Sequence, residues 1–169
     1  KRRKPFFSIV TISFNQETYL ANCIESVLNQ SCKDFEYIIQ DPGSNDNSRR
    51  IIESYKYDRR VNISFEEDIS PSDGLNKGFS KATGNYFLFI NSDDELCIDA
   101  LENLKKEIIN YPYFDVYSGS AMIIDHSGKF LRLAYSDRMN LARAAYCHCI
   151  LMQQSTVFKS SIFRKVGGF

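Results

Sequence analysis

Hydrophobic and polar residues form alternating blocks along the first 110 residues. Apolar runs at 6–13, 35–40 and 85–90 are typical of strands buried on both faces of a parallel sheet, and 61–65 alternates as a further strand. Apolar residues at helical spacing predict helices at 17–30, around 51–55, at 72–82 and at 99–110. A strand followed by a helix, four times over, predicts an α/β fold with a mainly parallel central sheet.

The pattern changes after residue 110. It predicts a strand at 114–118, a hairpin formed by 121–125 and 129–133, and then a short helix at 140–146, a strand at 154–158 and a helix at 160–166. Gly167 is expected to end the last helix and Asn15 to cap the first. The chain has no internal repeat and no linker within this pattern, so a single domain is expected.

Composition and charge exclude several classes of partner. The 169 residues are 43% hydrophobic, and 21 Lys and Arg balance 21 Asp and Glu. A zero net charge gives no general attraction to nucleic acid, so no nucleic-acid partner is expected and an anionic ligand needs a local site. No run approaches the roughly 20 apolar residues of a membrane span. Lys1-Arg2-Arg3-Lys4 is interpreted as a solvated tail or linker, with contact to anionic lipid as the alternative.

The five cysteines are an odd number without regular spacing, which argues against a disulfide framework and for a reducing compartment. Cys147-His148-Cys149 invites a zinc interpretation. Its spacing is tighter than in the usual zinc-binding pairs, and no second pair follows. We therefore expect ordinary side chains at these positions.

Acidic residues follow three of the predicted parallel strands. Asp41 comes after the second strand, Asp68 after the third, and Asp93 and Asp94 after the fourth. Ligands of such sheets bind outside the carboxyl ends of the strands, and carboxylates gathered there repel one another unless a cation or hydrogen-bond donors compensate. A single Asp after a strand is often only a turn former or a helix cap. Together, these residues favour a phosphate compound bound through Mg²⁺ or Mn²⁺, with Asp93 and Asp94 on the metal.

Other nucleotide-binding and hydrolytic motifs are absent from the sequence. There is no GxxxxGK[ST] phosphate loop and no GxGxxG after the first strand. There is also no Ser or Cys in a nucleophile elbow. These absences argue against a P-loop ATPase, a dehydrogenase and a hydrolytic triad.

Short motifs along nearly the whole chain, in order, resemble those of the family 2 glycosyltransferases, which have the GT-A fold. Asp41–Ser48 matches the pattern D-x-G-S-x-D-x-[ST], and Asn91-Ser92-Asp93-Asp94 stands where the family has its D-x-D metal motif. The other segments that resemble the family are Ser8–Asn15, Ser26–Gln30, Asp68–Gly78, Ala82–Gly84, Gln154–Thr156 and Val166–Phe169.

The resemblance implies a GT-A-type, Rossmann-like nucleotide-diphospho-sugar transferase fold with helices on both faces of the sheet. It implies transfer, with inversion, of a sugar from a nucleoside-diphosphate donor (UDP-sugar first) to a hydroxyl of a saccharide or lipid-linked acceptor, in cell-surface polysaccharide or glycoconjugate synthesis. A cytoplasmic location is implied, with peripheral association at the inner face of a membrane as one possibility, and the oligomeric state stays open.

Site residues are carried over by position. Asp41 is expected to bond the base, Asp68 to border the base and ribose, and Asp93 to bind Mn²⁺ or Mg²⁺ with Asp94 beside it. The residues expected at the donor are Thr11, Ser13, Asn15, Asp41, Asp68, Asn91, Ser92 and Asp93.

The resemblance also divides the chain. Residues 1–5 are expected to be a basic tail or linker and 6–169 a glycosyltransferase domain, with a nucleotide-binding half at about 6–110 and an acceptor half at 111–169. The family's usual catalytic base follows its GGF-D segment, so we expect the base beyond Phe169 and the natural chain to continue. Asp125 and Asp137 are the acids available within the second half.

Three positions depart from the family pattern. Asn91 replaces the first acid of the metal motif, Ser70 stands where many members have Gly, and Gln153 stands where related sequences often have His. Two alternatives stay open beside the transferase. One is a nucleotide-sugar-binding domain without turnover, and the other is a nucleotidyltransferase, whose Gly-rich basic turn after the first strand is absent here.

Overall fold

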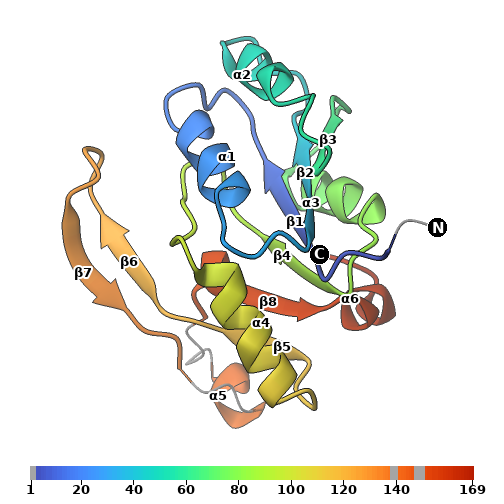
Figure 1. Ribbon diagram of the computed structural model, residues 1–169, viewed down its shortest axis with the longest axis vertical. Coiled ribbons are helices and arrows are strands. Elements are labelled where there is room, and N and C mark those ends of the chain that lie inside the picture. The colour runs from blue at the N-terminus through green and yellow to red at the C-terminus, as the bar shows by residue number, and fades with distance from the viewer. Residues whose placement is uncertain (1–2, 138–140, 147–150) are drawn as a thin grey trace.

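The computed structural model describes residues 3–137, 141–146 and 151–169, and shows strands and helices alternating along most of the chain (Figure 1). The elements are, in chain order, β1 (Phe7–Ile12), α1 (Leu20–Leu28), β2 (Phe35–Gln40), α2 (Ser48–Ser54), β3 (Val61–Ser64), α3 (Pro71–Ser80), β4 (Tyr86–Phe89), α4 (Ala100–Asn110), β5 (Val116–Ser118), β6 (Ala121–Ile124), β7 (Phe130–Ala134), α5 (Leu141–Ala145), the 3₁₀ turn η1 (Gln153–Ser155), β8 (Thr156–Lys159) and α6 (Ser160–Val166).

Six strands form one sheet in the order β3-β2-β1-β4-β8-β5. The first four are parallel, and β8 runs antiparallel between β4 and β5. Ile12 pairs with Gln40, and Gln40 pairs with Ser64, so the parallel strands end at a common edge. The predicted α/β fold with a mainly parallel sheet is confirmed.

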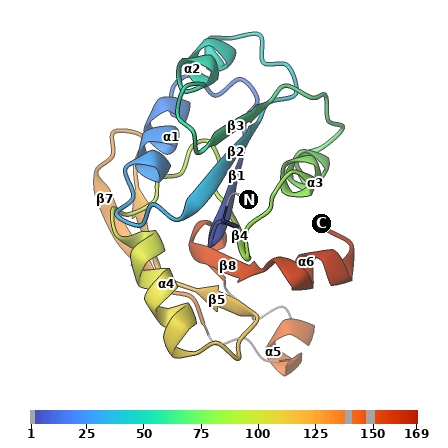
Figure 2. The ribbon, with the colours of Figure 1, turned by 45° about the vertical axis from the view of Figure 1, so that its right-hand side comes forward.

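Helices cover both faces of this sheet. Figure 2 shows α1, α2 and α4 on one side and α3 and α6 on the other. Side chains of a strand point alternately to opposite faces, so Phe7 and Ile9 lie in the core beneath α1, whereas Val10 lies in the core beneath α3. An aromatic cluster anchors the second face, with Phe79 stacked on Phe87 at 4.9 Å between ring centroids. The expectation of helices on both faces is therefore also confirmed.

Strands β6 and β7 form a separate hairpin that projects beside the main sheet (Figure 1). Met122 pairs with Leu133 across the hairpin, and both side chains are exposed. Asp125 closes the turn, because its Oδ1 accepts hydrogen bonds from the backbone N–H groups of Ser127 (2.8 Å) and Lys129 (3.1 Å).

The expected cap at Asn15 is wrong. Helix α1 begins only at Leu20, and its N-cap, Tyr19, makes no side-chain capping bond. Asn15 has a φ of 54° and bonds to another loop instead. The predicted end of the last helix is confirmed, since Gly167 follows α6 in the left-handed conformation.

Two sequence features lie wholly or partly outside the described residues. These are the Cys147-His148-Cys149 triplet and the first two residues of the basic run. In the part of the chain that is described, no helix is long and apolar enough to cross a membrane.

Candidate functional site

The parallel strands bring four loops to one edge of the sheet. Ser13 and Asn15 follow β1, Asp41 follows β2, and Asp68 lies in the loop after β3. The fourth loop, Asn91–Asp94, follows β4 and is called the acidic loop below. This edge is where ligands of open parallel sheets bind.

The loops after β1 and β2 are fastened to each other by side chains that accept backbone hydrogen bonds. Each loop contributes both donors and acceptors, so each is held in part by the other. The bonds are Asn15 N to Ser44 Oγ (2.9 Å), Gln16 N to Ser48 Oγ (2.9 Å), Glu17 N to Asp46 Oδ2 (3.1 Å), Asn45 N to Asn15 Oδ1 (3.0 Å) and Asn47 N to Glu17 Oε2 (2.8 Å).

Asp41 shapes the second of these loops from within. It is fully buried, and its carboxylate accepts bonds from the N–H groups of Gly43 (2.9 Å) and Ser44 (2.7 Å) and from Ser44 Oγ (2.6 Å). Gly43 has a φ of 121°, which L-residues with a side chain rarely adopt. The polar residues of the D-x-G-S-x-D-x-[ST] motif therefore build the loop. The expected contact of Asp41 with a base stays a prediction.

Two hydroxyl residues after and within β1 differ in their partners. Thr11 is fully buried beneath α1, where its Oγ1 accepts a bond from Tyr37 Oη (2.9 Å) and lies 3.9 Å from Cys23 Sγ. Burial raises the pKa of the Cys23 thiol to about 12. Ser13 Oγ is also buried, but it has no hydrogen-bond partner among the described residues. A buried hydroxyl without a partner at a strand end is a candidate contact for a ligand.

Asp68 packs against the start of α3. A Cβ on Gly74 would lie 2.7 Å from Asp68 Oδ2, so glycine allows this close approach. Burial is the main cause of the raised pKa of Asp68. The negative charges of Asp73 and Asp41 raise it further. Ser70, the position where many family members have Gly, is the N-cap of α3 and accepts a bond from Asp73 N (3.2 Å).

The acidic loop presents one exposed and one half-buried carboxylate. Asp93 is exposed, whereas burial and the neighbouring Asp93 charge raise the pKa of Asp94. Asn91 Nδ2 approaches Asp94 Oδ2 at 3.4 Å and opposes that shift. Ser92 is buried.

This pair of carboxylates fits a divalent cation only in part. Mg²⁺ and Mn²⁺ prefer oxygen ligands. A site with only two protein carboxylates is typically completed by phosphate oxygens and water. Within the described ranges, no group of three or more His, Cys, Asp or Glu residues could hold a metal ion alone. Asp93 and Asp94 therefore match a metal that arrives with a diphosphate.

The two acids of the second half are engaged elsewhere. Asp125 closes the β6–β7 turn, and its bonds to Ser127 and Lys129 lower its pKa. Asp137 forms an ion pair with Arg143.

Sequence reasoning missed the contacts of two side-chain amides, those of Gln153 and Asn76. Gln153 accepts a hydrogen bond from the side chain of Asn91. Asn76 makes two bonds to the backbone of Phe169: its Nδ2 donates to the carbonyl oxygen (3.0 Å), and its Oδ1 accepts from the backbone N–H (2.9 Å). Both contacts join residues more than 60 positions apart, so local pattern carries no signal for them. Asn76 lies within the segment Asp68–Gly78 that resembles the family, but the resemblance gives no sign of its partner.

Known glycosyltransferases are similar to this chain in sequence. TuaG of Bacillus subtilis, named for teichuronic acid biosynthesis, is 38% identical over 101 residues, which is 59% of this chain and 40% of TuaG. A GalNAc(5)-diNAcBac-PP-undecaprenol β-1,3-glucosyltransferase of Campylobacter jejuni is 30% identical over 122 residues, covering 70% of this chain and 39% of that protein. The chain thus spans less than half the length of these two relatives.

Solved structures agree on the fold. S. aureus TarS 1–349 superposes with a TM-score of 0.77 at 20% identity, over 98% of this chain and 49% of that one. A mannosyltransferase of Pyrobaculum calidifontis, solved with GDP-Man and Mn²⁺, gives 0.73 at 16% identity, over 99% of this chain and 48% of its own. These likenesses confirm the GT-A type of fold. The sequence model of "Glycosyl transferase family 2" matches residues 8–165, and the chain belongs to this family.

Proposed function

We propose that this chain binds the donor in a glycosyltransferase that moves a sugar from a nucleoside-diphosphate sugar, UDP-sugar first, to an acceptor hydroxyl with inversion. The observation that carries the proposal is the exposed Asp93 beside Asp94 at the carboxyl end of β4, at the edge where three other parallel strands end. Family membership supports it, and so do the UDP and UDP-GlcNAc complexes of TarS.

Each loop has a role in this proposal. Asp93 holds Mn²⁺ or Mg²⁺ with Asp94 beside it. The fastened loops after β1 and β2, with the unpartnered Ser13 hydroxyl, form one wall for the nucleoside, and Asp68, in the loop after β3, borders it. When bound, the metal offsets the charge that develops on the leaving diphosphate. The solved mannosyltransferase relative contains Mn²⁺, which supports the choice of ion.

The acceptor and the location belong to the whole protein. The names of two relatives refer to teichuronic acid biosynthesis and to an undecaprenol-linked acceptor. They support a saccharide or lipid-linked acceptor in cell-surface polysaccharide or glycoconjugate synthesis. We propose that the reaction takes place on the cytoplasmic side, with a lipid-linked acceptor held at the inner face of a membrane.

Calorimetry tests the donor site. We expect UDP to bind in the presence of Mn²⁺ more tightly than GDP or TDP, and Mn²⁺ alone to bind weakly, because two carboxylates without the diphosphate leave most of the coordination shell to water. If none of the three nucleotides binds, the proposal is wrong.

The second candidate is a nucleotide-sugar-binding domain without turnover. The engagement of Asp125 in a turn and of Asp137 in an ion pair favours it, since both are then poor choices for a base. Binding of UDP together with no transfer by the whole protein would support this candidate.

A further inference from the structure

Gln153 connects two distant parts of the chain at the acidic loop. Its Oε1 accepts a hydrogen bond from Asn91 Nδ2 at 2.9 Å, and its Nε2 donates to the backbone carbonyl of Phe89, also at 2.9 Å. The residue opens η1, the turn that leads into β8, and β8 is the antiparallel neighbour of β4. Gln153 therefore contacts both the last residue of β4 and the first residue of the acidic loop.

The Phe89 carbonyl decides which way the Gln153 amide faces. A carbonyl oxygen only accepts, so Gln153 directs its NH₂ group toward Phe89 and its own oxygen toward residue 91. Residue 91 must then donate a hydrogen bond. The amide of Asn91 does so, and an ionised Asp at this position could not. The neutral residue that begins the acidic loop is thus matched to Gln153.

The rest of Asn91 is also fixed. Its backbone carbonyl accepts bonds from Asp94 N (3.1 Å) and from Cys23 Sγ (3.3 Å), which close the turn and tie it to α1. Its side chain is held by Gln153 and reaches Asp94. Asp93, at the tip of this turn, stays exposed. The orientation of both carboxylates therefore depends on how firmly Asn91 is held.

We propose that Gln153 is a positioning residue for the metal site: by holding the Asn91 amide, it fixes the turn that presents Asp93 and Asp94 to a divalent cation and the donor diphosphate. The inference rests on the proposed function of this site. It adds that the segment before β8, within the expected acceptor half, controls affinity for the metal-bound donor.

Three variants test the role of Gln153. Gln153→Met keeps the length of the side chain and removes both hydrogen bonds. Gln153→His keeps one donor and one acceptor in a neutral ring. Gln154→Met is the matched control, because Gln154 lies in the same turn and no hydrogen bond joins its side chain to another described residue.

The measurements are the change in the electron paramagnetic resonance signal of Mn²⁺ when protein is added to a fixed mixture of Mn²⁺ and UDP, relative to the same mixture without protein, and calorimetric binding of UDP with Mn²⁺ or with EDTA. Partners that orient metal ligands typically contribute about 10–100-fold to metal affinity. We expect a loss of this size for Mn²⁺ in Gln153→Met, partial recovery in Gln153→His, and no loss in Gln154→Met. Binding of UDP in EDTA should be the same in all three variants.

Two results separate failure of this inference from failure of the proposed function. If the unmodified chain binds neither UDP nor Mn²⁺, the proposed function fails and the inference with it. If that chain binds both and Gln153→Met binds Mn²⁺ equally well, only the inference is overturned. Equal weakening of UDP binding with Mn²⁺ and with EDTA also overturns it, because a purely structural role would act on both.

A ligand-free measurement checks the contact itself. Asn91→Ala and Gln153→Met remove the same hydrogen bond, so the double variant should lower the thermal midpoint by less than the sum of the two single losses. Strictly additive losses would show that the two side chains do not interact in solution and would overturn the inference.

Discussion

The carboxylates at the site have three different environments. Asp41 is buried and accepts three hydrogen bonds within its own loop, whereas Asp93 is exposed. Asp68 is half-buried close to Asp73, and its pKa is raised. A raised pKa means that ionisation of the carboxyl group reduces the stability of the folded protein. Such a carboxyl group is more typical of a functional site than of one that stabilises the fold. The three residues should therefore respond differently to the same substitution.

Replacement of Asp68 should stabilise the folded protein at neutral pH. Its pKa in the folded protein lies above 3.8, so the folded protein binds this proton more tightly than the unfolded chain does. Ionisation then opposes folding as pH rises through that range. We expect Asp68→Asn to raise the free energy of unfolding at pH 7 and the gain to vanish as pH falls below the unfolded pKa of 3.8, measured by urea unfolding.

Asp58 provides a control of opposite sign. Hydrogen bonds donated by Arg60 lower the pKa of Asp58, so its contribution to stability is present above the unfolded pKa and is lost as pH falls. Asp58→Asn should therefore reduce stability at pH 7. The same direction of change in both variants would contradict this account.

Asp93 and Asp41 should separate metal binding from loop structure. Asp93→Asn is expected to abolish the Mn²⁺-dependent part of UDP binding and to change stability by less than about 0.5 kcal/mol, as is usual for an exposed position. Asp41→Asn turns an acceptor into a donor among buried donors, which costs about 1–3 kcal/mol. It should weaken UDP binding with or without Mn²⁺. Identical Mn²⁺ titrations of the two variants would refute this division of roles.

At the scale of elements, the site depends on two loops that stabilise each other. The loop at 41–48 has the shape that Asp41 and the positive φ of Gly43 give it, and it supplies partners for the backbone of 15–17. Apart from Ser48, which begins α2, none of these residues lies in a helix or strand that would hold the loop independently. A change in the backbone of one loop should therefore also alter the other loop.

Gly43→Ala tests this dependence. No atom would obstruct the added Cβ, so the effect arises from the φ of 121°, and such strain costs about 1–3 kcal/mol. We expect reduced stability in urea unfolding together with weaker UDP binding. Gly119→Ala is the control, because its Cβ would make an ordinary 3.6 Å contact with Ser155. A Gly43→Ala protein as stable as Gly119→Ala would contradict the prediction.

The order of elements was predictable because each buried strand is a short apolar run and each helix has one apolar stripe. The incorrect cap at Asn15 has a physical cause, since its side chain bonds to Asn45, 30 residues away, and a local pattern contains no such information. The sequence predicted a strand near 156 but not its place between β4 and β5. Pairing of distant strands follows from packing of the whole sheet.

The site was predictable to the level of loops. The rule that ligands bind beyond the carboxyl ends of parallel strands located Asp41, Asp68 and Asp93 at one edge. It could not show that Asp41 is buried, because burial depends on the neighbouring loop. It also could not pair Asn91 with Gln153, which are 62 residues apart.

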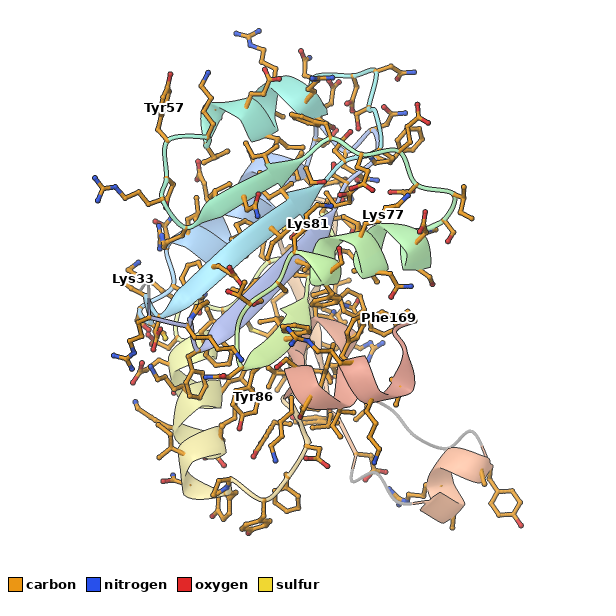
Figure 3. All side chains as sticks on the ribbon, turned by 90° about the vertical axis from the view of Figure 1, so that its right-hand side faces the viewer. Lys33, Tyr57, Lys77, Lys81, Tyr86 and Phe169 are labelled. Carbon is orange, nitrogen blue, oxygen red and sulfur yellow. The ribbon has the colours of Figure 1, made fainter. Side chains whose placement is uncertain are left out.

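For the whole molecule, zero net charge conceals a separation of charge. The edge proposed for the donor carries carboxylates, whereas the opposite edge has a cleft of about 820 Å³ whose lining has five basic residues (Arg3, Lys4, Lys33, Arg59 and Arg60) and two acidic ones (Asp34 and Glu36). Figure 3 shows Lys33 at one end of the sheet and Lys77, on α3, toward the other. The carboxylates Asp93 and Asp94 disfavour an anionic diphosphate beside them unless a cation accompanies it, which is a physical reason to expect dependence on a divalent metal.

The last prediction concerns catalysis by residues 1–169. Inverting transfer needs a base against the acceptor hydroxyl, and a positioned base contributes roughly 10²–10⁴-fold to the rate. Asp125 and Asp137 are held in a turn and an ion pair. We therefore expect this chain to bind UDP-sugar with Mn²⁺ and to transfer sugar poorly, measured by release of UDP with and without saccharide acceptors. Asp125→Asn and Asp137→Asn should leave that low rate unchanged. Efficient transfer that either variant abolishes would show that the base lies within these residues after all.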